Sequence, residues 1–182
     1  DVYKRQKRNS DRYQYVLPYY DFSRSFFTNN NFASFNFVSQ GDNILKDTNS
    51  LRSRMINNLD IQSYGYFSEI GFKNNFNYYL KNTISAGKNN TEYDSSPHVK
   101  FMNIFELVSS FPLINTSDKY SNFLDPKISL RINPSDMKSY KNENRQISND
   151  NLFNINRLGL IDTLESGNNL TLGLDFKREN ID

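Results

Sequence analysis

The stretch Leu170-Thr171-Leu172-Gly173-Leu174-Asp175-Phe176-Lys177 alternates apolar and polar residues without a break. Successive side chains of a β-strand point to opposite faces, so this period of two predicts a strand with one apolar and one polar side. Similar runs recur along the chain and last about ten residues, whereas strands of soluble sheets are typically ~5–6 residues long. Because a tilted strand needs ~9–11 residues to cross a bilayer, the pattern favours a transmembrane β-barrel.

The alternation predicts an all-β fold, an antiparallel transmembrane β-barrel segment of about seven long strands that do not complete a barrel. The expected strands are roughly 12–23, 31–40, 51–63, 70–81, 99–111, 124–132 and 170–177. Short connections are expected at 26–30, 64–67 and 114–120, and long ones at 41–49, 85–97 and 134–168. Alternation of short and long connections is typical of outer-membrane barrels, whose long loops are external. The connection 134–168 is thus expected to be a long external loop, with a short strand near 152–155.

Charged side chains decide which side of the expected strands meets lipid. An Arg or Lys on the lipid side near the midplane costs ~2–4 kcal/mol. The third and fourth strands carry their basic residues on one side, namely Arg52, Arg54, Lys73 and Lys81. That side is therefore expected to face an aqueous lumen, and the Leu, Phe and Ile side to face the membrane.

Composition narrows the function classes. A net charge of +2 gives no electrostatic argument for nucleic acid, and no apolar run approaches the ~18 residues of a transmembrane helix. The chain has no Cys, which fits a reducing cytosol as well as an envelope protein without a disulfide in this stretch. His98 is the only histidine, and no zinc-type cluster or glycine-rich phosphate loop is present. We predict no enzyme activity, no metal and no cofactor.

The chain is expected to be an internal piece of a longer protein. Its first six residues, Asp1-Val2-Tyr3-Lys4-Arg5-Gln6, look like the translation of a transposon-end sequencing adaptor and are left out of the fold prediction. Residues 7–182 are expected to form part of one outer-membrane barrel domain.

Basic residues on the expected lumen side are the candidate binding residues. Such side chains can hold an anionic lipid or a sugar phosphate through charge-assisted hydrogen bonds. The alternative is a solvated polar lumen in which Asp60, Asp125 and Asp175 supply the counter-charges. The candidates are Arg52, Arg54, Lys73, Lys81, Lys127, Arg131 and Lys177.

The stretch Asn151–Asp162, followed by Asn169–Leu174, resembles the LptD (OstA) family of LPS-assembly outer-membrane proteins. Tyr15–Phe22 and Leu130–Met137 are also similar to stretches of that family's barrel, and the resemblance covers roughly Arg12 to Lys177. Three residues match the family's loop pattern and imply a structural role in closing the lumen from outside: Arg157, Gly159 and Asp162. The family's disulfide cysteines have no match here.

The resemblance implies a function in transport and assembly without catalysis. It implies insertion of lipopolysaccharide into the outer leaflet in the cell outer membrane of a Gram-negative bacterium. The implied partners are lipopolysaccharide, the lipoprotein LptE inside the barrel, and periplasmic LPS-bridge proteins that bind through a domain not contained in this chain. A TonB-dependent receptor or porin-type barrel would use the same strand pattern and is the alternative. A soluble β-sandwich binding protein is the third possibility.

Overall fold

The computed structural model describes residues 14–27, 32–46, 49–137 and 145–181. These residues form one antiparallel sheet of nine strands and contain no helix. None of them therefore belongs to a helix long and apolar enough to cross a membrane. The expected adaptor sequence at residues 1–6 lies outside the described residues.

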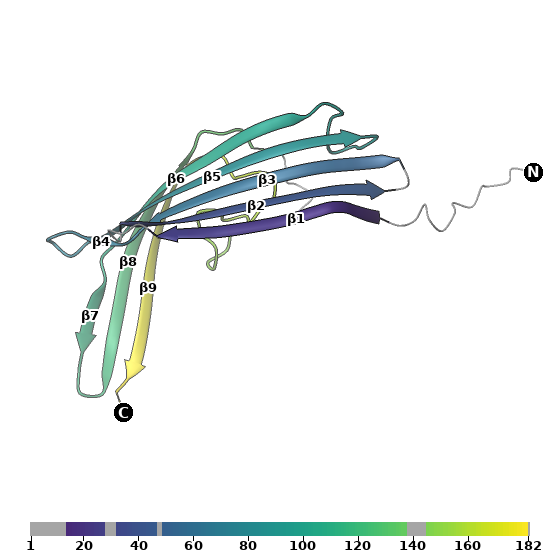
Figure 1. Cartoon of the computed structure of the whole chain (residues 1–182). Helices are drawn as coiled ribbons and strands as arrows, with labels where there is room; N and C mark the ends of the chain where they lie inside the picture. The colour runs from purple at the N-terminus through teal and green to yellow at the C-terminus, as the bar shows by residue number, and fades with distance from the viewer. Residues whose placement is uncertain (1–13, 28–31, 47–48, 138–144, 182) are drawn as a thin grey trace, which may run out of the picture. The chain divides into compact units, whose positions relative to one another are not determined.

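Seven of the strands are long and two are short (Figure 1). The order across the sheet is β1-β2-β3-β5-β6-β8, with β9 on the far side of β8. The short strands pair at the margins, β4 with β5 and β7 with β8. The long strands are β1 (Gln14–Phe27), β2 (Ala33–Lys46), β3 (Ser50–Ser63), β5 (Lys73–Lys88), β6 (His98–Ser110), β8 (Tyr120–Asn133) and β9 (Gly167–Asn180); the short ones are β4 (Tyr66–Phe67) and β7 (Leu113–Thr116).

The all-β antiparallel prediction is confirmed. In the part of the chain that the structure describes, no pairing joins β1 to β9, so the sheet is not closed.

The long connection predicted at 41–49 is wrong, because β2 continues to Lys46 and only residues 47–49 connect it to β3. Glycine and small polar residues at this point look like a turn, yet partners from the neighbouring strands hold them extended. The Asp42 carboxylate accepts hydrogen bonds from Arg52 and Arg54 of β3, at 3.2 and 2.7 Å. A Cβ at Gly41 would lie 2.3 Å from the Tyr20 ring of β1, which covers this glycine. Cross-strand contacts therefore outweigh the local turn preference.

Other predicted boundaries also move. β5 continues to Lys88, so the long connection predicted at 85–97 shrinks to 89–97. The turn predicted at 64–67 extends over 64–72 and contains β4, which pairs with the start of β5. The predicted short strand near 152–155 is wrong, since these residues form turns in which the Asn154 N–H bonds to the Asn151 carbonyl at 3.0 Å. The predicted regular alternation of short and long connections is thus lost.

Contacts divide the chain into two compact units, which we describe separately. Unit 1 consists of residues 1–24, 37–58 and 81–101, and unit 2 of residues 25–36, 59–80 and 102–182. Unit 2 contains a buried apolar cluster formed by Met102 and Ile104 of β6 and Leu164, with Tyr79 and Ile155 packed against it.

The pairing of β8 with β9 sets the two faces of unit 2. The register runs unbroken from Tyr120↔Asn180 to Asn133↔Gly167. Leu170, Leu172, Leu174 and Phe176 share one side of β9 and are 62–70% exposed. We call this side, with Phe105 of β6 and Ile128, Leu130 and Ile132 of β8, the apolar face. The opposite side is the polar face, and its residues Glu106, Ser129 and Arg131 are buried.

Candidate functional site

The polar face of unit 2 carries a buried hydrogen-bonded cluster. Glu106 of β6 lies opposite Arg131 of β8 in the strand register, and each is 2% exposed. Ser129 donates to one oxygen of the Glu106 carboxylate at 2.9 Å, and Asn77 of β5 donates to the other at 3.0 Å. Buried polar groups are stable only when their hydrogen bonds are made, and both oxygens of Glu106 have a partner.

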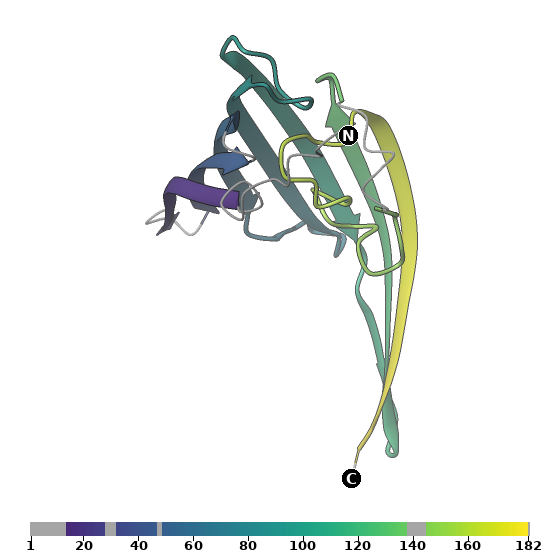
Figure 2. The same cartoon turned by 90° about the vertical axis from the view of Figure 1, so that its right-hand side faces the viewer.

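Residues 145–166, the segment that precedes β9 in Figure 2, cover this cluster and are bonded to its side chains. Arg131 anchors the segment by donating from Nε to the Ile155 carbonyl at 3.0 Å and from a terminal nitrogen to the Glu165 carbonyl at 2.9 Å. Asn133 donates to the same Glu165 carbonyl at 2.7 Å. An irregular segment buried against a sheet needs partners for its carbonyl groups, and β8 supplies them from its side chains.

A charge pair inside the segment reinforces this anchor. Arg157 donates to both oxygens of the Glu165 carboxylate, at 2.9 and 2.5 Å, in the bidentate geometry that strengthens arginine–carboxylate pairs. Arg131 lies 3.8 Å from the same carboxylate. Apolar packing also stabilises the segment, because its residues Leu158, Leu160 and Leu164 are buried.

Phe153 of the segment packs against β9. A Cβ at Gly173 would lie 2.6 Å from the tip of the Phe153 ring, so the glycine gives the ring room to lie on the strand. The ammonium of Lys127 sits 4.7 Å from the ring centroid, within the range of a cation–π contact, and also pairs with Asp175. This is the strand whose alternation predicted the fold, and its glycine is on the polar face.

Replacing Gly173 with valine is expected to lower the free energy of unfolding by about 1–3 kcal/mol, because the added side chain overlaps the Phe153 ring. Urea unfolding of the full-length protein in lipid vesicles measures the loss. The same substitution in a Phe153→Leu background is expected to cost less, since the shorter side chain leaves room. An equal loss in both backgrounds would rule out the ring contact as the cause.

The structure divides the seven predicted basic residues between the two units. In unit 1, Arg52 and Arg54 pair with Asp42, and Lys81 is buried. In unit 2, Arg131 and Lys127 belong to the covered polar face, Lys177 is exposed and pairs with Glu179, and Lys73 is exposed at the start of β5. Binding of lipopolysaccharide or LptE by any of them stays a prediction.

The three residues of the loop pattern lie within the covering segment. Arg157 forms the buried pair with Glu165. Gly159 adopts φ of +58°, a left-handed conformation that favours glycine, and a Cβ there would meet nothing within 4 Å. Asp162 is half-buried. The segment's position outside the membrane stays a prediction.

Sequence reasoning missed Glu106, Asn133 and Glu165. One signal was available: the side of β6 that carries Glu106 also carries Met102 and Ile104, which are out of place on a side exposed to water. Such a mixture indicates that another element covers that side. No group of three or more His, Cys, Asp or Glu residues suited to a metal occurs among the described residues.

A polar hollow of about 570 Å³ adjoins the cover in unit 2. Its lining includes Asp60, Asn77, Tyr79 and Glu106 from the strands and Phe153 from the segment. No protein-family model matches this chain, and no curated protein matches it.

Proposed function

We propose that this chain forms part of the wall of a β-barrel in the outer membrane of a Gram-negative bacterium. The observation that carries the proposal is the inverted polarity of unit 2. Leu172 is 70% exposed at the centre of the apolar face, whereas Arg131 and Glu106 on the opposite face are buried. A sheet in water hides its apolar side, and a large exposed apolar patch indicates contact with a partner or a membrane.

The height of the apolar face supports a bilayer as that contact. On β8 the same side extends to Leu124, which pairs with Phe176 of the apolar face. From Leu124 to Ile132 it measures ~27 Å along a strand at ~3.4 Å per residue. At the ~40° tilt common in such barrels this corresponds to ~21 Å, close to the ~25 Å apolar band of outer-membrane proteins. Beyond the band, the guanidinium of Arg178 stacks 4.5 Å above the Tyr120 ring, a pairing suited to the headgroup boundary.

Within that membrane we propose a role in assembling lipopolysaccharide in the outer leaflet, without catalysis. The support is the resemblance to the LptD family, whose loop pattern falls on Arg157, Gly159 and Asp162. The proposed partners are lipopolysaccharide, LptE inside the barrel and periplasmic LPS-bridge proteins. The polar cluster that anchors residues 145–166 is compatible with the predicted role of that loop in closing the lumen.

Depletion of the full-length protein in its host tests this role. Surface lipopolysaccharide, measured by labelling of intact cells, is expected to fall and to recover when the wild-type gene is restored. Unchanged surface lipopolysaccharide together with reduced uptake of a small solute would contradict assembly and favour a receptor or porin. Recovery of the protein in the soluble fraction would contradict the membrane proposal itself.

A further inference from the structure

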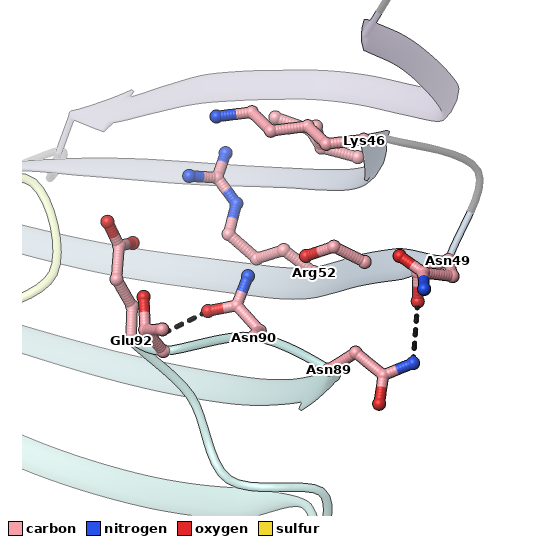
Figure 3. A pocket seen from close by; sticks show the side chains of 9 residues that line it. Lys46, Asn49, Arg52, Asn89, Asn90 and Glu92 are labelled. Carbon is pink, nitrogen blue, oxygen red and sulfur yellow. Dashed lines mark hydrogen bonds between the residues drawn. The ribbon is translucent and has the colours of Figure 1, made fainter. Parts of the chain in front are cut away.

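A second polar hollow, of about 330 Å³, lies in unit 1. It opens on the side of β2 and β3 that carries Asp42 and Arg52, at the ends of these strands. Residues 89–92, which follow β5, close one side, and the Asn89 amide fixes them to the end of β3 by donating to the Asn49 carbonyl at 3.0 Å. Figure 3 shows Lys46, Arg52, Asn90 and Glu92 around the hollow.

Hydrogen-bond donors converge on this hollow. The Asn90 side-chain oxygen accepts from the backbone N–H groups of Glu92 and Tyr93, at 2.7 and 3.3 Å. Its amide nitrogen is therefore the end turned away from the backbone, and it points toward Arg52 (Figure 3). The Nε of Arg52 is buried and has no hydrogen-bond partner among the described residues. A buried donor without a partner is costly unless a ligand supplies an acceptor.

The charged side chains around the hollow have a net positive charge, which favours binding of an anion. Asp42 is shared by Arg52 and Arg54, so one carboxylate balances two guanidinium groups. Lys46 of β2 adds another positive charge, and its ammonium lies toward the Arg52 guanidinium (Figure 3). Glu92 supplies a second carboxylate at the margin, which leaves the group with one excess positive charge. Like charges at close range repel, and an anion between them removes that cost.

We propose that this hollow binds the phosphate group of a sugar phosphate. A phosphate offers several acceptor oxygens to a guanidinium fork and an ammonium, which form strong charge-assisted hydrogen bonds with it. The volume exceeds what a phosphate alone fills, and the hydroxyls of Ser50 and Thr91 line the remainder, which suits a sugar attached to the phosphate. The phosphate site itself does not depend on the proposed function. Only the inference that a phosphorylated glycolipid carries the phosphate rests on it.

Binding of glucose 1-phosphate to the full-length protein in detergent tests the site, with calorimetry as the measurement. Lys46→Gln and Arg52→Gln are each expected to weaken binding by about tenfold, because each removes a charged donor. Glu92→Gln is expected to strengthen it by about threefold, since it removes a like charge from beside the phosphate. Lys88→Gln is the matched control, because Lys88 is an exposed lysine that does not line the hollow, and its binding is expected to be unchanged.

Opposite shifts for the lysine and glutamate variants distinguish a binding role from a structural one. Millimolar glucose 1-phosphate that fails to bind the wild-type protein, or that binds all four variants alike, would overturn the proposal. Lys46 is exposed at the end of β2, so its variant is expected to fold even where Arg52→Gln does not. Circular dichroism spectra of the variants that match the wild-type spectrum verify folding independently of the ligand.

Two further binding measurements identify the kind of molecule that carries the phosphate. A phosphorylated glycolipid in mixed micelles that binds at least tenfold more tightly than glucose 1-phosphate supports a lipid source, with its dephosphorylated form as control. Equal affinity supports the site and assigns it to a soluble sugar phosphate. Loss of phosphate binding would leave the membrane proposal intact, because that proposal depends on the apolar face of unit 2.

Discussion

Replacing Arg131 with alanine is expected to lower the free energy of unfolding by about 3–5 kcal/mol, the range found when one member of a buried charge pair is removed. Arg131 is 2% exposed and holds the carbonyl groups of Ile155 and Glu165. Without it, these buried acceptors lose their donor, and the Glu106 carboxylate loses the positive charge opposite it in the register. We therefore expect residues 145–166 to detach from the polar face.

Two measurements on the full-length protein in lipid vesicles check this expectation. Urea unfolding followed by circular dichroism gives the loss of stability, and limited proteolysis reports cleavage within residues 145–166. Lys177→Ala is the control, because Lys177 is an exposed basic residue of β9 and its loss is expected to cost no more than ~0.5 kcal/mol. A loss below about 1 kcal/mol for Arg131→Ala, with the segment still protected, would contradict the anchoring role.

Replacing Leu172 with arginine is expected to cost about 2–4 kcal/mol, because a charge would enter the hydrocarbon region near its centre. This cost comes from the lipid around the side chain and not from lost packing, since Leu172 is 70% exposed. At a surface in water the same substitution would change stability by no more than ~0.5 kcal/mol. The size of the loss therefore separates a membrane face from a water-exposed one.

Gln62→Arg is the matched control for this substitution. Gln62 is an exposed residue of β3 and bonds to Asp60, which can pair with an arginine introduced there. Its replacement is expected to leave the unfolding free energy in vesicles nearly unchanged. A Leu172→Arg variant as stable as the Gln62→Arg variant would contradict contact between the apolar face and lipid.

The period of two was enough to predict the seven long strands and which of their residues share a side. In β9, Leu170, Leu172 and Leu174 fall on the exposed side as predicted, and Thr171 falls on the covered side. The prediction succeeds because a strand fixes side-chain direction locally, residue by residue. The expected strands were too few to complete a barrel, and the sheet of the described residues is indeed open.

The ends of strands were harder to predict. Gly41 and Asp42 have the local character of a turn, but Asp42 is held in β2 by two arginines of the next strand. Such a pairing is specified by the register and not by the local sequence.

The anchor of the cover was the largest omission. The resemblance implied that Arg157, Gly159 and Asp162 help to close the lumen, but not that Arg131 and Asn133 of β8 hold the segment. Residues 145–166 are irregular and mix polar residues with buried leucines, and the length of the connection between two expected strands suggested an external loop. The buried arginine that anchors them lies on β8 and looks, in the sequence, like any other lumen-facing cation. Arg131, one of the predicted binding residues, makes three contacts with the segment.

The accessibility of spin labels in the membrane-inserted protein tests directly whether the apolar face meets lipid. These 182 residues contain no cysteine, so among them a cysteine introduced at Leu172 or at Gln62 carries the only label. We expect the label at Leu172 to collide more with oxygen, which concentrates in lipid, than with a water-soluble nickel complex. The label at Gln62 is expected to show the reverse. A label at Leu172 that collides preferentially with the nickel complex would contradict the claim that the apolar face meets the membrane.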